Sequence, residues 1–123
     1  MIEAKEIPHK MLSKDAFSQW LGISILNVEK GRCKVALTIR PEMLNSMQKA
    51  HGGISYSLAD TAFGFAANTH GNYAVSIETS INHINILVLK QNSSNQYELI
   101  TNIQALQTGI LSFSDLRMAN KAP

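Results

Sequence analysis

The chain has 123 residues, which is enough for one domain with a hydrophobic core. Hydrophobic residues make up 45% of it and charged residues 16%, as is ordinary for a soluble globular protein. The formal net charge of +2, with the basic residues scattered, gives no support for a nucleic-acid-binding or membrane-surface protein. We therefore expect a single domain over residues 1–123, with no nucleic acid and no membrane among its partners.

Targeting signals and cysteines point to a cytoplasmic protein. The first ten residues lack the apolar core of a signal peptide, and no apolar run approaches the ~20 residues that span a bilayer. Cys33 is the only cysteine, so an internal disulfide is impossible and a reducing compartment fits. We therefore expect a cytoplasmic location.

The N-terminal part of the chain predicts one short helix. Residues 1–11 show no clear pattern and are expected to form a loose leader. Residues 13–22 predict the helix, because Ser13 is a suitable N-cap and Gly22 a suitable C-terminal stop.

A hairpin and a loop follow. Alternating apolar and polar residues are typical of a half-buried strand, and they are clearest just before Pro41, which ends the pattern. The predicted segments are a strand at 23–28, a turn at 29–32, a strand at 33–40 and a polar loop at 41–50.

The stretch from His51 to Asn68 predicts one long central helix. Apolar residues occupy nearly all of its faces, and a helix of that kind is buried, so something must wrap it. Asp60 breaks the pattern, and no Lys or Arg occurs between Lys49 and Lys90 to neutralise it. Because burial of an unpaired carboxylate is costly, we expect a chain that keeps one to use it.

The C-terminal part of the chain predicts strands. The predicted segments are one bulged strand or two at 73–89, a turn at 90–96, a strand at 97–106, a turn at 107–109 and a strand at 110–118. The whole order predicts an α+β fold in which an antiparallel β-sheet wraps around one long central helix. One small sheet leaves a flank of such a helix open, so we expect a homo-oligomer, either a dimer or a dimer of dimers.

The start of the central helix carries chemistry. Gly52 and Gly53 leave backbone N–H groups accessible at the positive end of the helix dipole, where they can polarise a carbonyl oxygen during acyl transfer. Asp60 can act as base or nucleophile in the same reaction, and Asn45 and His51 can hold a substrate group or a water.

Each of these features also has a plainer interpretation. A glycine pair alone is more often a simple turn before a helix. Asp60 alone can be an interface carboxylate, and His51 alone is more often a helix N-cap or a core histidine. Tyr56 and two phenylalanines, Phe63 and Phe65, can line an aryl pocket but are more often core residues.

The combined pattern resembles a known family. Asn45, His51-Gly52-Gly53 and Leu58-Ala59-Asp60-Thr61-Ala62 resemble the signature N-x5-H-G-G-x4-L-A-D-x-A of hotdog-fold thioesterases of the PaaI (phenylacetate-pathway) type. The resemblance covers roughly residues 13–82. It implies a hotdog fold and hydrolysis of an acyl-CoA or aryl-acyl-CoA thioester, with no cofactor and no metal.

The resemblance also implies roles for individual residues. Asp60 matches the catalytic carboxylate and Gly53 the residue whose N–H polarises the carbonyl, while Asn45 and His51 match residues that position the thioester. The implied substrate-binding residues are Gly52, Thr61 and Ser76, the last by position on the strand after the helix. In the implied dimer, Asp60 of one chain faces Gly53, His51 and Asn45 of the other.

Three departures from the family pattern leave an alternative open. Gln48 stands where the family usually has glycine, residues 85–88 lack the usual Arg-Pro or Ser-Pro bend, and the family has one more strand after the match to 110–118. The alternative is a non-catalytic acyl-CoA-binding hotdog module, and a hydratase ranks below both. The chain lacks a complete Gly-x-Ser-x-Gly motif, clustered metal ligands and a phosphate-binding glycine loop.

Overall fold

The structure of the chain is a computed structural model that describes residues 3–71, 97–105 and 111–120, the last range for its backbone only. The predicted strands at 73–89, the turns at 90–96 and 107–109, the bend position at 85–88 and Ser76 lie outside the described residues. Among the described helices, none has the length and apolar character needed to cross a bilayer.

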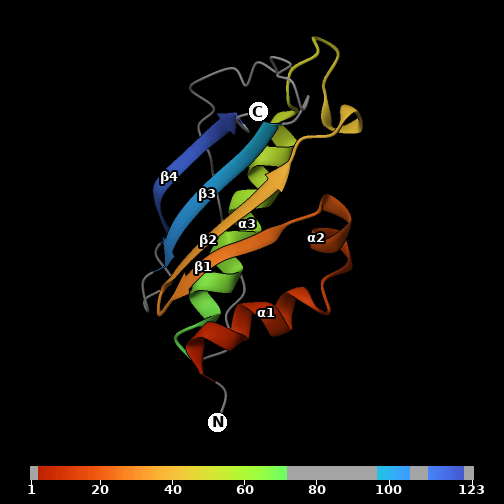
Figure 1. The fold of residues 1–123 in the computed structure, drawn as a ribbon. Coiled ribbons are helices and arrows are strands. Elements are labelled where there is room, and N and C mark those ends of the chain that lie inside the picture. The colour runs from red at the N-terminus through yellow and green to blue at the C-terminus, as the bar shows by residue number, and fades with distance from the viewer. Residues whose placement is uncertain (1–2, 72–96, 106–110, 121–123) are drawn as a thin grey trace.

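Four described strands form one antiparallel sheet in the order β1-β2-β3-β4 (Figure 1). The hairpin and the two C-terminal strands predicted from the sequence are confirmed to within about two residues. In β3 every second residue is buried, as expected for a sheet with one face on the core. The strands are β1 (Ser24–Glu29), β2 (Arg32–Thr38), β3 (Tyr97–Ala105) and β4 (Leu111–Asn120).

The long helix α3 (Gly52–Asn68) packs against β2 and β3 and supplies much of the core. Leu58, Ala62 and Phe65 are almost fully buried against sheet residues that include Val35 and Leu99. The predicted α+β arrangement, a sheet packed on one central helix, is confirmed. Phe63 is also buried, so the core interpretation of the phenylalanines fits the structure better than an aryl pocket.

Among the described residues, one face of α3 is exposed in the single chain, as expected for a helix packed on one small sheet, but the expected burial of Asp60 is not found there. Gly53 and Asp60 are exposed, and Ser57 and Gly64 between and beyond them are half-buried. These positions recur at helical spacing and form one stripe of small and polar residues. The carboxylate of Asp60 therefore lies at the surface of the chain rather than inside it.

The expected loose leader is instead helical. A short turn η1 (Ala4–Glu6) leads into α1 (Ile7–Leu12), which lies beside α3 (Figure 1). Pro8 stands in the first turn of α1, where its missing N–H costs nothing, and it is buried. The last two residues of α1, Met11 and Leu12, pack on the core, which stabilises a segment that lacks a clear sequence pattern.

The second helix, α2 (Ala16–Leu21), begins at a different cap from the one predicted. Asp15 is its N-cap and accepts the Ser18 N–H at 3.0 Å, whereas Ser13 donates its hydroxyl to the Lys10 carbonyl. The prediction of Ser13 was wrong because the chain is still finishing α1 at that point. Gly22 ends α2 in the left-handed region with φ 77°, as predicted.

The C-terminal end of α3 is fastened to the sheet. Thr69 Oγ1 accepts the Gly31 N–H at 2.6 Å, and His70 Nε2 lies 2.9 Å from the Ala105 carbonyl oxygen. Gly31 has φ 79°, and a Cβ there would meet the His70 ring and the Ala105 oxygen at 3.0–3.1 Å. These contacts join the β1–β2 turn, the end of α3 and the end of β3.

Candidate active site

The N-terminus of α3 is capped by its own histidine. His51 precedes the helix in an extended conformation, and its Nδ1 accepts the Gly53 N–H at 2.9 Å. Nδ1 therefore carries no proton, and a neutral ring holds its proton at Nε2. The His51 carbonyl accepts the Ile54 N–H at 2.9 Å. The cap interpretation of His51 fits this geometry, and the Gly53 N–H already has an acceptor.

Gly53 is crowded on the side of the imidazole. A Cβ placed on Gly53 would lie 3.1 Å from His51 Nδ1, closer than an ordinary contact. Any side chain at this position therefore pushes the imidazole away before it meets a substrate. With glycine at position 53, the first turn of the helix has room for both the His51 imidazole and a substrate group.

Asn45 organises the loop before α3. Its side-chain Oδ1 accepts the Met47 N–H at 2.9 Å and the Lys49 N–H at 3.1 Å, and its own N–H donates to the Lys49 carbonyl at 2.7 Å. A bridge between Leu44 and Ala50 closes the loop at its base. The Asn45 Oδ1 is thus occupied by N–H groups of its own loop. The side-chain N–H₂ group is the donor that can bind a substrate oxygen.

Gln48, at the tip of that loop, has φ 61° and is the one non-glycine residue in the described ranges with a positive φ. A left-handed conformation is costly for a residue with a Cβ and easy for glycine. The loop therefore has a left-handed backbone conformation at position 48, which favours glycine, although the residue there is glutamine.

Asp60 and Thr61 lie about two turns further along α3, so Gly53 and Asp60 are separated by ~10 Å along the helix axis. The single chain places His51, Gly52 and Gly53 at the start of α3 and Asn45 in the loop before it, and leaves Asp60 about two turns away.

One contact near Asp60 was not anticipated from the sequence. Thr61 Oγ1 lies 3.4 Å from Ser18 Oγ of α2, and Ser18 is 1% exposed. Ser18 and its partner Asp15 were read only as parts of a short helix. The Asp-x-x-Ser spacing is a cap signal that could have identified the start of α2, but the contact with α3 has no local sequence signal.

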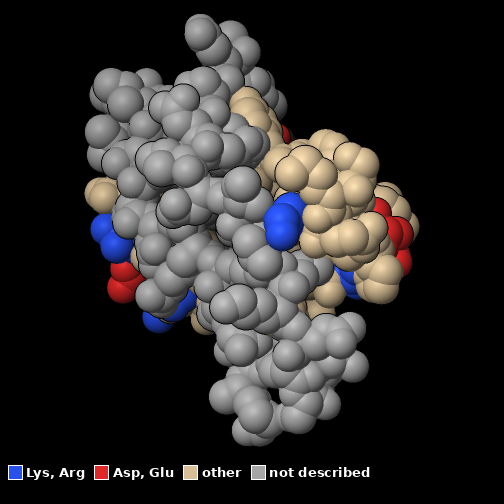
Figure 2. Space-filling model, turned by 90° about the horizontal axis from the view of Figure 1, so that it is seen from above, with Lys and Arg blue, Asp and Glu red and all other residues tan. Residues whose placement is uncertain are grey.

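Charges around this end of the molecule are mixed. Figure 2 shows the face seen from above in Figure 1, where blue and red side chains of the described residues are interspersed among neutral ones. On that face the described Lys and Arg residues do not gather into one basic patch.

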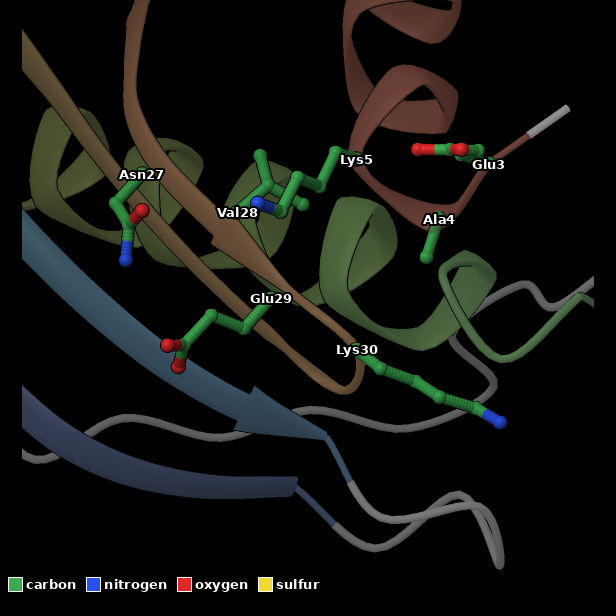
Figure 3. A pocket seen from close by; sticks show the side chains of 7 residues that line it. All are labelled: Glu3, Ala4, Lys5, Asn27, Val28, Glu29 and Lys30. Atoms are coloured by element: carbon green, nitrogen blue, oxygen red, sulfur yellow. The ribbon is translucent and has the colours of Figure 1, made fainter.

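A hollow of about 400 Å³ lies elsewhere, between η1 and the β1–β2 turn (Figure 3). Glu3, Lys5, Glu29 and Lys30 give it charges of both signs. It lies near the C-terminal end of α3, because Gly31 of the same turn bonds Thr69. None of the predicted site residues lines it, so it is not the candidate active site.

The described residues contain no cluster of three metal-ligating side chains. His51 and His70 stand at opposite ends of α3, and His70 is engaged with the sheet. Cys33 is fully buried, and burial raises the pKa of its thiol to about 12, so it stays protonated at neutral pH. The burial of Cys33 fits a structural role in the core.

Comparisons with known proteins find similarity to thioesterases and putative esterases. The model of the thioesterase superfamily matches residues 47–89. The chain is 41% identical over 76 residues to the acyl-coenzyme A thioesterase PaaI of Escherichia coli, which covers 62% of this chain and 54% of that protein. It is 40% identical over 74 residues to a putative esterase of Archaeoglobus fulgidus, with 60% and 48% covered. The chain thus spans about half the length of these curated relatives in the matched regions.

Comparison with solved structures extends this similarity over more of the chain. The solved structure of the E. coli PaaI protein from the phenylacetic acid degradation operon matches with a TM-score of 0.72 and 28% identity, over 86% of this chain and 83% of that one. The long helix on an antiparallel sheet is therefore the hotdog fold. The chain is therefore similar to members of the thioesterase superfamily and shares the hotdog fold of the PaaI-type proteins.

Proposed function

We propose that the chain hydrolyses acyl-CoA or aryl-acyl-CoA thioesters. The observation that carries this proposal is the spatial arrangement on α3. A glycine pair opens the helix beside His51, and a surface carboxylate, Asp60, follows on the same face. The likeness to an acyl-coenzyme A thioesterase from E. coli supports the substrate class.

In the proposed reaction the Gly53 N–H donates to the thioester oxygen as negative charge develops there. Asp60 either takes a proton from a water that attacks the carbonyl carbon, or attacks that carbon itself. In both routes the C–S bond breaks and CoA leaves as a thiolate that takes up a proton. In the second route water then hydrolyses the anhydride formed with Asp60.

The carbonyl has to compete with His51 for the Gly53 N–H. The bond to His51 Nδ1 at 2.9 Å is of ordinary length, so substrate entry exchanges one acceptor for another. An imidazole displaced in this way stays beside the thioester, where its Nε2–H can donate to the substrate. This exchange gives His51 the positioning role implied by the family.

The remaining proposed roles follow the same arrangement. Asn45 offers its amide N–H₂, Gly52 and Thr61 border the substrate, and Ser76, which lies outside the described residues, stays a prediction for the water. The partner is a second copy of the chain, because the uncovered stripe of α3 includes both Gly53 and Asp60 and these lie ~10 Å apart in one chain. A cytoplasmic location also stays a prediction.

The alternative function is acyl-CoA binding without turnover. The observation that favours it is the occupied Gly53 N–H, since an imidazole that never leaves would prevent carbonyl polarisation. Asp60 has no evident purpose in that alternative.

Thiol release from a panel of aliphatic and aryl acyl-CoAs tests the proposal. We expect turnover of at least one class, abolished in Asp60→Asn. Binding of acyl-CoA by calorimetry with no thiol release from any member of the panel would establish the alternative instead.

A further inference from the structure

Three polar side chains form a line from α2 to the candidate active site. Asp15 Oδ1 accepts the Ser18 N–H at 3.0 Å, and Asp15 Oδ2 accepts the Ser18 hydroxyl at 2.6 Å. Ser18 Oγ in turn lies 3.4 Å from Thr61 Oγ1 on α3. Thr61 directly follows Asp60 in α3, so this line ends one residue from the proposed catalytic carboxylate, on the neighbouring side of the helix.

The direction of the hydrogen bonds follows from the number of protons. A serine hydroxyl has one proton, and Ser18 donates it to the Asp15 carboxylate. Its oxygen can therefore only accept from Thr61, which makes Thr61 the donor in that contact. The Thr61 oxygen then offers lone pairs, and no proton, to any further group.

The helix that carries Ser18 is held at both ends. Asp15 caps its start, and the Arg40 guanidinium donates to the carbonyls of Trp20 and Leu21 at 3.0 Å and 3.2 Å at its end. Leu21 is fully buried. α2 therefore keeps Ser18 at a fixed place over the side of Thr61.

We propose that Ser18, oriented by Asp15, is a positioning residue that makes the Thr61 hydroxyl an acceptor for a hydrogen-bond donor beside Asp60. This inference rests on the proposed hydrolysis. The donor is either the attacking water or an amide N–H of the CoA pantetheine arm. Because 3.4 Å is long for an O–H···O bond, the contact biases the Thr61 hydroxyl, and effects of about three- to tenfold are expected.

Asp15→Asn tests the direction of the bonds while keeping the cap. Asparagine keeps an oxygen for the Ser18 N–H and is as good an N-cap as aspartate. The asparagine N–H₂ group can occupy the place of Oδ2, and it cannot accept the Ser18 hydroxyl proton. Ser18 is then free to donate this proton to Thr61. We expect thermal stability close to wild type and a three- to tenfold loss in kcat or rise in KM.

A double-mutant cycle tests whether Ser18 acts through Thr61. The variants are Ser18→Ala, Thr61→Val and their combination, each checked for folding by thermal unfolding. We expect Ser18→Ala to impair the wild type three- to tenfold and to have little further effect on Thr61→Val. Ser24→Ala is the matched control, since Ser24 also donates a 3.4 Å hydroxyl bond, to the Ala36 carbonyl within the β1–β2 hairpin, and should keep wild-type kinetics.

The kinetic constants separate the outcomes. A fall in kcat at unchanged KM assigns the donor to water, and a rise in KM at unchanged kcat assigns it to the pantetheine amide. An active wild type with unchanged kinetics in Asp15→Asn and Ser18→Ala overturns this inference alone, as does a Ser18→Ala effect that persists in full on Thr61→Val. If the wild type has no thioesterase activity, the proposed function is wrong, and this inference is then wrong as well.

Discussion

The Gly53 N–H donates to His51 Nδ1 at 2.9 Å, so the group proposed to polarise the thioester also stabilises the start of α3. Two functions of His51 can therefore be separated by substitution. His51→Ala removes the cap and should lower the free energy of unfolding by about 1 kcal/mol, whereas His51→Asn should restore stability because asparagine is a strong N-cap.

Both variants should lose at least about tenfold in kcat/KM, because neither carries the imidazole that positions the thioester. Thermal unfolding and thiol release on the same preparations check this. Wild-type turnover in His51→Asn would show that the imidazole only caps the helix.

Gln48→Gly should stabilise the chain. Gln48 occupies φ 61°, where glycine has no steric penalty, and the gain is reduced by the greater freedom of glycine in the unfolded chain. We expect a net rise of about 0.5–1 kcal/mol in the free energy of unfolding, measured in urea. Gln48→Ala keeps the Cβ and should give no gain; an equal gain from alanine would place the cost in the glutamine side chain instead of the backbone.

Asp60→Asn should remove more than nine-tenths of the thioesterase activity while the fold persists. The amide has nearly the same shape but is a poor base and nucleophile. Because Asp60 is exposed in the single chain, removal of its charge should change stability by no more than about 0.5 kcal/mol. Residual turnover above a tenth of wild type would remove Asp60 from the proposed mechanism.

Composite sites can be tested by mixing two inactive variants. Asn45→Asp keeps an oxygen for the Met47 and Lys49 N–H groups, so the loop should survive, but it loses the amide N–H₂. Equal amounts of Asn45→Asp and Asp60→Asn are mixed and allowed to exchange chains at random. Half of the resulting two-fold dimers then contain one chain of each variant, and each of these mixed dimers has one intact site. About a quarter of wild-type activity should return.

Chain exchange has to be verified, for example with two differently tagged variants. Confirmed exchange without any return of activity would place the site within one chain. A monomeric wild type in light scattering at micromolar concentration would argue against the same proposal.

The Cys33 thiol should make the chain less stable in alkali. Burial raises the pKa of this thiol to about 12 from the usual 9.0. Above pH 9 the unfolded chain therefore releases a proton that the folded chain keeps, and stability falls as pH rises toward 12. The stability of the wild type relative to Cys33→Ala should fall by roughly 1 kcal/mol between pH 9 and 10, measured by urea unfolding. A constant difference would show that the folded thiol ionises normally.

The sequence predicted α3 well because its signals agree: a capping residue, a glycine pair and a sustained apolar period from Ile54 onward. It predicted the hairpin and C-terminal strands for the same reason, since their alternation is local. It missed α1, where it predicted a loose leader, because α1 is stabilised by packing of Met11 and Leu12 on the core. It overestimated the burial of Asp60 in the single chain because Asp60 lies on the side of α3 that does not pack on the described sheet.

The candidate site was predictable only in its composition. The motif brought His51, Gly53 and Asp60 to attention, but the acceptor of the Gly53 N–H depends on the rotamer of His51. The contact between Ser18 and Thr61 joins residues far apart in the chain, and no pattern in either segment indicates it. Relationships of this kind depend on tertiary packing and need a structure.

The clasp of Gly31, Thr69, His70 and Ala105 gives the two ends of α3 different evolutionary freedom. At the clasp, backbone and side-chain atoms of three elements meet within about 3 Å, so a side chain at Gly31 or the loss of either hydrogen bond disturbs the packing of all three. At the opposite end the helix is capped by His51 and preceded by a short loop. Loop residues there other than Asn45 and His51 could therefore change to suit another proposed acyl group while the helix remains held by its other end.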